Sequence, residues 1–133
     1  MKKLTILFIF MLICRNLPAP HRAVCYIEIT GPINYYTPLI RAVGVVESKL
    51  DTLAYNPLEQ ATGYFQIRPI RLRDYNNRTG KNYTLDQMYD YKIAESIFLY
   101  YTKGRSYEVV SKEWNGSGPK TLVYWNLVKK ELI

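Results

Sequence analysis

The stretch TPLIRAVGVVESKL, residues 37–50, decides the fold class of this chain. Thr37 and Pro38 are typical of an N-cap and of the first helical position after it. The apolar residues then recur at intervals of four, three and four, the spacing of one helix face; they are Leu39, Val43, Val46 and Leu50. Glu47 lies one turn after Val43, at the edge of this face. The stretch therefore predicts a helix that carries a carboxyl group at the margin of its buried side.

Two interpretations of Glu47 follow from this position. A carboxyl group at the margin of an apolar face is partly desolvated, which favours its protonated form. A carboxyl that keeps its proton near neutral pH is what a general acid requires. Glutamates are usually exposed, however, and Glu47 can equally be a surface residue that pairs with Arg41 or Lys49. Local sequence leaves both interpretations open.

The rest of the chain predicts further helices joined by loops. Residues 51–62 and 70–81 contain Asn-Pro, Asn-Asn and Thr-Gly pairs, so we expect loops there. Between them, residues 63–69 predict a turn or one short helical segment that ends at the proline. Helical spacing predicts three later helices, over residues 86–101, 106–114 and 120–133. At 133 residues the chain is expected to form a mainly α, compact single domain.

Local signals set the expected ends and packing of these helices. Thr84 is expected to cap the helix over residues 86–101, and Lys103-Gly104 to end it. The last helix offers four large apolar side chains for packing, namely Leu122, Trp125, Leu127 and Val128. A weak strand signal is confined to residues 24–29.

The N-terminus indicates export. Lys2-Lys3 precede the apolar run Leu4 to Cys14, which is the pattern of a secretory signal. The run is shorter than the roughly 20 apolar residues that a spanning helix needs. We therefore expect residues 1–23 to be a secretory signal peptide or short N-terminal anchor, and residues 24–133 to be the functional domain. The expected location is the periplasm or the cell envelope.

Composition excludes several kinds of chemistry. His21 is the single histidine, and removal of the leader would leave Cys25 as the single cysteine, so histidine-dependent triads, thiol nucleophiles and zinc sites are not expected. The net charge of +7 attracts polyanions, but the basic residues are scattered and no nucleic-acid motif is present. We expect no metal, no cofactor and no nucleic-acid partner.

Four motifs in a fixed order give a more specific prediction. They are Glu47-Ser48, Gly63-Tyr64-Phe65-Gln66-Ile67-Arg68-Pro69, Glu113-Trp114-Asn115-Gly116 and Thr121-Leu122-Val123-Tyr124, with the expected long helix between the second and the third. This order resembles the soluble-type lytic transglycosylase family, the lysozyme-like enzymes of bacterial cell walls that are related to goose-type lysozymes. The resemblance covers roughly residues 36–130.

The resemblance implies a lysozyme-like fold and a reaction on peptidoglycan. Glu47 would protonate the departing oxygen of the β-1,4 bond between N-acetylmuramic acid and N-acetylglucosamine. It would then act as base on the muramic C6 hydroxyl, which attacks C1 and gives a 1,6-anhydro product. Residues implied in substrate binding are Ser48, Gly63, Tyr64, Phe65, Gln66, Trp114, Asn115 and Tyr124.

Two departures from the family pattern bear on the site. Trp114 stands where the family usually has a tyrosine, so a phenol that could hydrogen-bond the acid is missing there; Tyr124 is a candidate to supply it. Tyr64-Phe65 are bulkier than the usual Leu-Met.

Two other functions stay open on the sequence. A goose-type lysozyme-like muramidase would use water, positioned by a second carboxylate, for which Asp51 and Glu59 are the candidates. A non-catalytic module would hold glycan without cutting it. Expected partners are peptidoglycan glycan strands and, by family association, a cell-wall-spanning secretion, conjugation or phage apparatus, with the protein as a monomer.

Overall fold

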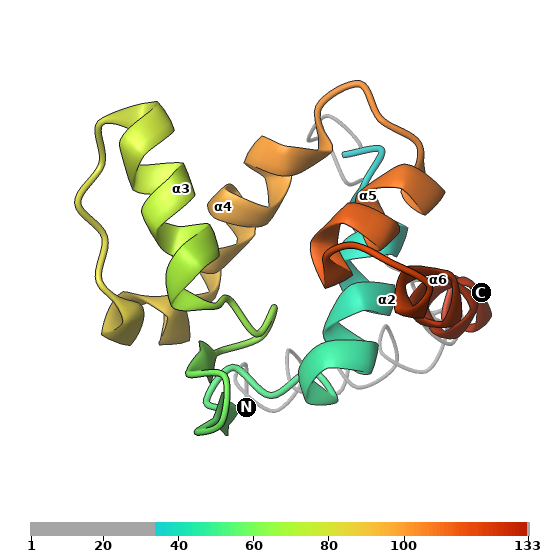
Figure 1. Cartoon of the computed structure of the whole chain (residues 1–133), viewed down its shortest axis with the longest axis horizontal. Helices are drawn as coiled ribbons and strands as arrows, with labels where there is room; N and C mark the ends of the chain where they lie inside the picture. The colour runs from blue at the N-terminus through green and yellow to red at the C-terminus, as the bar shows by residue number, and fades with distance from the viewer. Residues whose placement is uncertain (1–33, 133) are drawn as a thin grey trace, which may run out of the picture. The chain divides into compact units, whose positions relative to one another are not determined.

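The computed structural model describes residues 34–132, which form a mainly α fold, as predicted. The expected leader, the predicted start of the domain at residue 24 and the strand signal at 24–29 lie outside these residues. The elements in chain order are α2 (Thr37–Ser48), β1 (Tyr55–Asn56), β2 (Ala61–Thr62), α3 (Pro69–Thr79), the 3-10 helix η1 (Leu85–Tyr89), α4 (Tyr91–Thr102), α5 (Tyr107–Asn115) and α6 (Lys120–Lys130) (Figure 1). None of the helices in this part of the chain has the length and apolar character needed to cross a membrane.

Helix α2 forms where the sequence predicts it, with two differences at its ends. Tyr36, not Thr37, is the N-cap, and Pro38 lies in the first turn. The helix ends at Ser48 because Lys49 and Leu50 adopt positive φ angles of 60° and 70°. Leu50 therefore leaves the helix and is 43% exposed, so its predicted place in the apolar stripe is wrong. The buried residues are Leu39, Ile40, Ala42, Val43 and Gly44.

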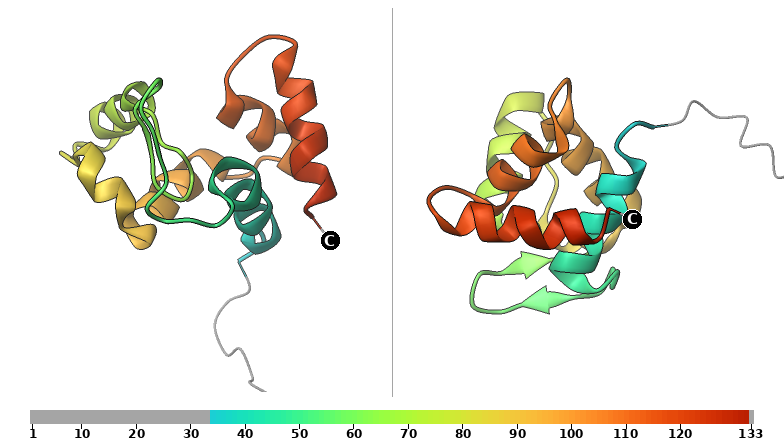
Figure 2. Two further views of the ribbon diagram at one scale, coloured as in Figure 1. Left: turned by 90° about the horizontal axis from the view of Figure 1, so that it is seen from below. Right: turned by 90° about the vertical axis from the view of Figure 1, so that its right-hand side faces the viewer.

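A short hairpin occupies part of the region predicted as a loop. β1 and β2 pair antiparallel, with Tyr55 opposite Thr62 (Figure 2). Each strand has two residues, which is too short for an alternating pattern to be visible in the sequence. Gly63 follows with a φ of 75°, and a Cβ there would lie 2.1 Å from the Met88 carbonyl oxygen. Only glycine fits this position, and it fixes the path of the chain toward α3.

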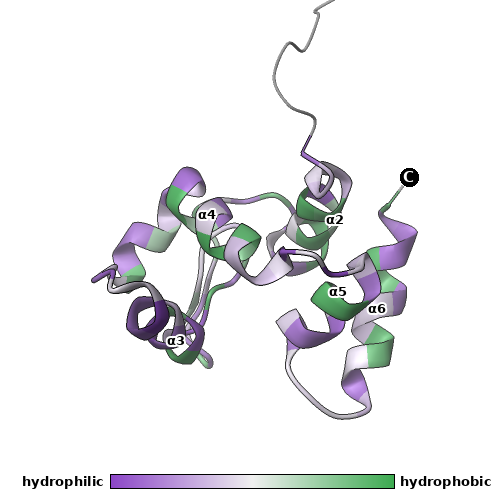
Figure 3. Ribbon diagram, turned by 90° about the horizontal axis from the view of Figure 1, so that it is seen from above, coloured by the Kyte–Doolittle hydropathy of each residue, from purple (hydrophilic) through white to green (hydrophobic). Residues whose placement is uncertain are grey.

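Helix α3 corrects the prediction of a loop over residues 70–81. Pro69 occupies the first turn and Gly80, with a φ of 71°, ends the helix, so both are start and stop signals. Its buried residues are Leu72 and Tyr75. Such sparse apolar spacing hides the helix from a periodicity argument, and the ribbon of α3 is among the most hydrophilic segments in Figure 3.

The helix predicted over residues 86–101 is broken into η1 and α4. Thr84 does begin the first segment, and its backbone N–H donates to Gln87 Oε1 at 2.9 Å. The break falls at Asp90, whose Oδ1 accepts from the N–H groups of Lys92 and Ile93 at 2.8 and 3.2 Å. Asp90 is thus an N-cap that starts a new helix inside the predicted one.

Helices α5 and α6 begin where the sequence predicts, to within one residue. They pack against each other, and α6 also packs against α2. The buried residues of α6 are Tyr124 and Val128. Leu122 and Leu127 are 53% and 46% exposed, so the prediction that both pack inward is wrong. The side of α6 that carries Tyr124 faces α2 instead.

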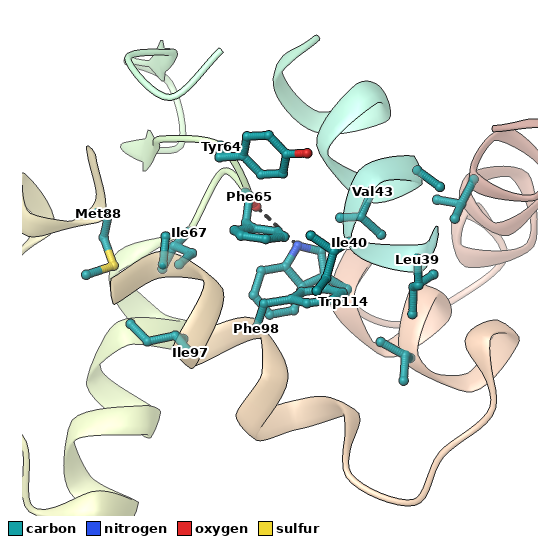
Figure 4. Packing of buried hydrophobic residues seen from close by; sticks show 14 of the residues in the cluster. Leu39, Ile40, Val43, Tyr64, Phe65, Ile67, Met88, Ile97, Phe98 and Trp114 are labelled. Atoms are coloured by element: carbon teal, nitrogen blue, oxygen red, sulfur yellow. Dashed lines mark hydrogen bonds between the residues drawn. The ribbon is translucent and has the colours of Figure 1, made fainter. Parts of the chain in front are cut away.

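An aromatic cluster joins three separate segments in the core. Phe65 stacks on Phe98 of α4 with ring centroids 4.7 Å apart, and Trp114 of α5 meets Phe98 edge-on at 4.9 Å. Trp114 Nε1 donates to the Phe65 carbonyl oxygen at 3.2 Å (Figure 4). Aromatic pairs of this kind add about 0.5–1.5 kcal/mol beyond their area burial. The cluster therefore fixes the loop before α3 against the end of α5.

Candidate active site

A cavity of about 360 Å³ opens where the end of α2, the loop before α3, the start of α3 and the end of α5 meet. This volume lies within the usual range of small-ligand sites, roughly 300–1,000 Å³. Its lining is mostly polar and charged, and comprises Glu47, Gln66, Arg68, Ile70, Arg71, Asp74, Trp114, Asn115 and Gly116.

The predicted pair Glu47-Ser48 points in two directions. Glu47 lines the cavity, and the Tyr124 hydroxyl donates to its Oε1 at 2.6 Å. Ser48 Oγ instead donates to the carbonyl oxygens of Tyr64, at 2.9 Å, and Gly44, at 3.2 Å. Ser48 thus ties α2 to the loop, and Glu47 is the member of the pair that lines the cavity.

Burial controls the protonation of Glu47. Burial raises the pKa of its carboxyl from 4.5 to about 6, against the opposing effects of the Tyr124 hydrogen bond and the nearby Arg68. Burial, and the neighbouring Glu47 charge, raise the pKa of Tyr124 as well. Tyr124 therefore stays a phenol and donates. Glu47 can release and recover a proton near neutral pH while one fixed donor stabilises its anion.

Four of the nine predicted site residues line the cavity: Glu47, Gln66, Trp114 and Asn115. Gln66 has a positive φ of 48°, and its Nε2 donates to the carbonyl oxygens of Gly63 at 3.0 Å and Ala54 at 3.3 Å. Its amide thus holds the loop while the residue borders the cavity.

Gly63, Tyr64 and Phe65 build the loop and do not line the cavity. Phe65 is fully buried, and its carbonyl oxygen is taken by Trp114. The Tyr64 ring lies so close to Gly44 that a Cβ there would fall 2.1 Å from Tyr64 Cζ. The side chains of Tyr64 and Phe65 are buried in the core, so their size does not reduce the space in the cavity.

Tyr124 also lies outside the cavity lining, but it contacts the acid directly. The sequence identified it as a candidate to supply the phenol that Trp114 lacks, and the structure places its hydroxyl on Glu47. Trp114 itself is 6% exposed and uses its Nε1 in the core. Although residue 114 is a tryptophan, Glu47 therefore still accepts a hydrogen bond from a phenol, that of Tyr124.

The sequence pattern does not predict the wall of the cavity that α3 supplies. Arg71 and Asp74 both line the cavity from this helix. The proline at residue 69 and the glycine at residue 80 were the signals that could have identified the helix. The spacing of three would then have placed Arg71 and Asp74 on one face.

Asp74 is a carboxylate held by two donors. Arg78 Nε lies 2.8 Å from its Oδ1, and the Tyr101 hydroxyl donates to its Oδ2 at 2.7 Å. These two hydrogen bonds lower the pKa of Asp74 below its ordinary value. Asp74 is therefore ionised at neutral pH and is a weak base.

The two carboxylates proposed to position water do not line the cavity. Asp51 Oδ1 accepts from the Leu53 N–H at 2.8 Å, which closes a local turn. Glu59 Oε2 lies 3.0 Å from Arg68 Nε and ties the hairpin to the start of α3.

Residues 34–132 contain no cluster of three His, Cys, Asp or Glu side chains able to hold a metal ion. No protein-family model matches this chain, and neither a curated protein nor a solved structure matches it. The residues that line the cavity define the chemistry that it can support. They offer one proton donor and acceptor of raised pKa, a fixed carboxylate and two arginines.

Proposed function

We propose that the protein is a peptidoglycan lytic transglycosylase that cleaves the β-1,4 bond between N-acetylmuramic acid and N-acetylglucosamine. The observation that carries the proposal is the Glu47 carboxyl, which borders the cavity with a pKa raised to about 6 by burial and accepts a 2.6 Å hydrogen bond from Tyr124. The order of the four sequence motifs supports the same reaction.

The mechanism uses one carboxyl group twice. Protonated Glu47 donates its proton to the glycosidic oxygen as the bond to C1 breaks, and the N-acetylglucosamine end leaves as an alcohol. Tyr124 stabilises the carboxylate that forms. Glu47 then accepts the proton of the muramic C6 hydroxyl while that oxygen bonds to C1. The ring closes as a 1,6-anhydro end, Glu47 is protonated again, and no water is consumed.

A single acid suffices because the substrate supplies the nucleophile. Most glycoside hydrolases need a second carboxylate as nucleophile or base. Asp51 and Glu59 are engaged elsewhere, as described above. This leaves Glu47 as the group with the pKa that both proton transfers require.

A muramidase that uses water is the second candidate, and one observation favours it. Asp74 borders the same cavity as Glu47 and is ionised, as the base of an inverting hydrolase would be. Its lowered pKa makes it a poor base, so transglycosylation remains our proposal.

We propose that the protein acts in the periplasm or cell envelope, as a monomer without a cofactor. Its substrates would be glycan strands near an apparatus that crosses the wall. A non-catalytic glycan-binding module is disfavoured because such a module gains nothing from a partly buried carboxyl of raised pKa, whose desolvation costs stability.

Digestion of purified peptidoglycan sacculi tests the proposal. The wild-type protein should release soluble fragments, and Glu47→Gln, which keeps the shape of the side chain, should not. Asp51→Asn is the matched control because Asp51 is exposed and does not line the cavity. Unchanged digestion by Glu47→Gln would remove Glu47 as the acid.

A further inference from the structure

Arg71 lines the cavity in an unusual environment for a cation. Its guanidinium carbon lies 4.5 Å from the ring centroid of Trp114 and 5.0 Å from that of Tyr101. Its Nη2 donates to the carbonyl oxygens of Glu113 at 2.9 Å and Trp114 at 3.1 Å. Two aromatic faces and two carbonyl groups therefore hold the guanidinium in one orientation.

Arg71 makes no salt bridge within residues 34–132. The nearest carboxylates are committed elsewhere, because Asp74 pairs with Arg78 and Glu113 pairs with Arg105. Burial lowers the pKa of Arg71, and the nearby Asp74 and Glu113, which raise it, do not offset this effect. The site thus carries a positive charge that the described part of the chain does not neutralise.

The remaining donors of Arg71 are accessible. Nε and Nη1 have no hydrogen-bond partner among the described residues, and no side-chain nitrogen or oxygen buried there lacks a partner. These two nitrogens are therefore open to solvent or ligand on a residue that borders the cavity. Nε and Nη1 lie on different edges of the guanidinium, so either can donate one charge-assisted hydrogen bond to a carboxylate oxygen.

The surroundings of Arg71 combine cationic groups with one ionised carboxylate, Asp74, which is paired with Arg78. Arg68 lines the same cavity while its Nε pairs with Glu59, and the first turn of α3 contains no acidic residue. The N-terminal end of a helix carries a partial positive charge of its own. Glu47, at the other side of the cavity, is partly neutral because burial raises its pKa.

We propose that Arg71, with Arg68 beside it, forms a subsite for a carboxylate that the substrate carries near the cleaved bond. The inference rests on the proposed function, since it assumes that the cavity binds muramyl glycan. N-acetylglucosamine is uncharged, whereas a muramyl residue carries either peptide-stem carboxylates or, without a stem, a free lactyl carboxylate. The subsite would thus select peptidoglycan over neutral amino-sugar polymers.

Equilibrium binding to an uncleaving protein tests the subsite, and Glu47→Gln serves as the background. The first pair of probes is the N-acetylglucosamine–N-acetylmuramic acid disaccharide with a free lactyl carboxylate and its lactyl methylamide. The second pair is the same disaccharide with a dipeptide stem ending in free carboxylates and its carboxamide. We expect about tenfold tighter binding of the charged member in at least one pair, the size of a net charge-assisted hydrogen bond.

Substitution of Arg71 should abolish this preference. Glu47→Gln/Arg71→Met should bind both members of each pair equally, while Glu47→Gln/Arg73→Met, which removes the same charge from an exposed residue of α3, should keep the preference. A purely structural role of Arg71 would weaken charged and uncharged probes alike. If Arg71→Met unfolds, Arg71→Lys serves instead; it keeps the charge but not the planar guanidinium held against Trp114 and Tyr101, and should reduce the preference several-fold.

The outcomes separate the subsite from the proposed activity. A preference in the first pair alone assigns the lactyl carboxylate, and one in the second pair alone assigns the stem. Binding without any preference, a preference that survives in Arg71→Met, or no binding at millimolar probe overturns the subsite. Cleavage of sacculi by the wild-type protein is measured separately. Cleavage without a preference overturns the subsite alone, and a preference without cleavage overturns the proposed activity alone.

Discussion

Two carboxylates border the same cavity, Glu47 on α2 and Asp74 on α3, and each accepts a hydrogen bond from a tyrosine. Glu47 is partly buried, and this desolvation raises its pKa to about 6. Asp74 lies near the surface and also accepts from Arg78, so its pKa falls. The two walls of the cavity thus shift the pKa of a carboxyl group in opposite directions.

The comparison shows that a hydrogen bond from a tyrosine does not by itself determine the direction in which the pKa of the carboxyl group shifts. Tyr124 and Tyr101 make hydrogen bonds of 2.6 and 2.7 Å, and each favours the ionised form of its carboxyl group. Burial outweighs this effect at Glu47, whereas Arg78 reinforces it at Asp74. A group that must give and retrieve a proton needs the first environment.

Removing each carboxyl group in turn gives the largest contrast. Glu47→Gln should lower the rate of fragment release from sacculi by about 10³-fold, since general acid–base catalysis contributes 10²–10⁴-fold. Asp74→Asn should lower it by less than about tenfold. Initial rates of release measure both. Equal losses in the two variants would show that Asp74 takes part in the chemistry.

Removing the hydroxyl of Tyr124 or of Tyr101 should have different effects on the pH dependence of kcat/KM. Tyr124→Phe removes a donor that lowers the pKa of Glu47, so the alkaline limb of kcat/KM should move to higher pH. Its maximum should fall by about 10- to 100-fold, since removing a hydrogen bond to a charged group costs about 1.5–3 kcal/mol. Tyr101→Phe should leave the limb near pH 6. A limb that Tyr124→Phe fails to move would break the assignment of this pKa to Glu47.

The free energy of unfolding should respond in opposite directions to Glu47→Gln and Asp74→Asn. The folded protein holds the Glu47 proton up to about pH 6, whereas an unfolded glutamate releases it near 4.5. This stability contribution is present below pH 4.5 and is lost as the pH rises through 6. Glu47→Gln should therefore raise the free energy of unfolding by about 1–2 kcal/mol at pH 8, and by little at pH 4.

Asp74 gives the reverse sign because its pKa is lowered in the folded state. Its contribution is present above the unfolded pKa and is lost as the pH falls through the folded one. Asp74→Asn should therefore destabilise the protein at neutral pH, with a difference that shrinks in acid. Urea unfolding at several pH values measures both. The same sign in both variants would contradict the account of the two environments.

The two walls also differ in how far the sequence predicts them. The apolar spacing of α2 is regular, so its position and the marginal place of Glu47 follow from periodicity. The contact of Tyr124 with Glu47 joins residues 77 positions apart. Only the motif resemblance indicated it, because local pattern carries no information about such pairs.

The α3 wall was missed because its helix buries little. Leu72 and Tyr75 are its buried residues, and most of the others are polar, including asparagines and an aspartate that also favour turns. Arg71 and Asp74 therefore fall in a region, residues 70–81, for which the sequence predicts a loop. The exposure of Leu122 on α6 has a related cause, since apolar character alone does not tell which side of a helix meets its neighbours.

The mass of the fragments released from sacculi tests the central claim most directly. If Glu47 alone performs both proton transfers, every new muramyl end is a 1,6-anhydro ring. These ends are lighter than reducing ends by one water, and carry no label when the digestion runs in ¹⁸O water. Reducing ends that contain ¹⁸O would contradict the account, and would assign the reaction to water activated by a second carboxylate such as Asp74.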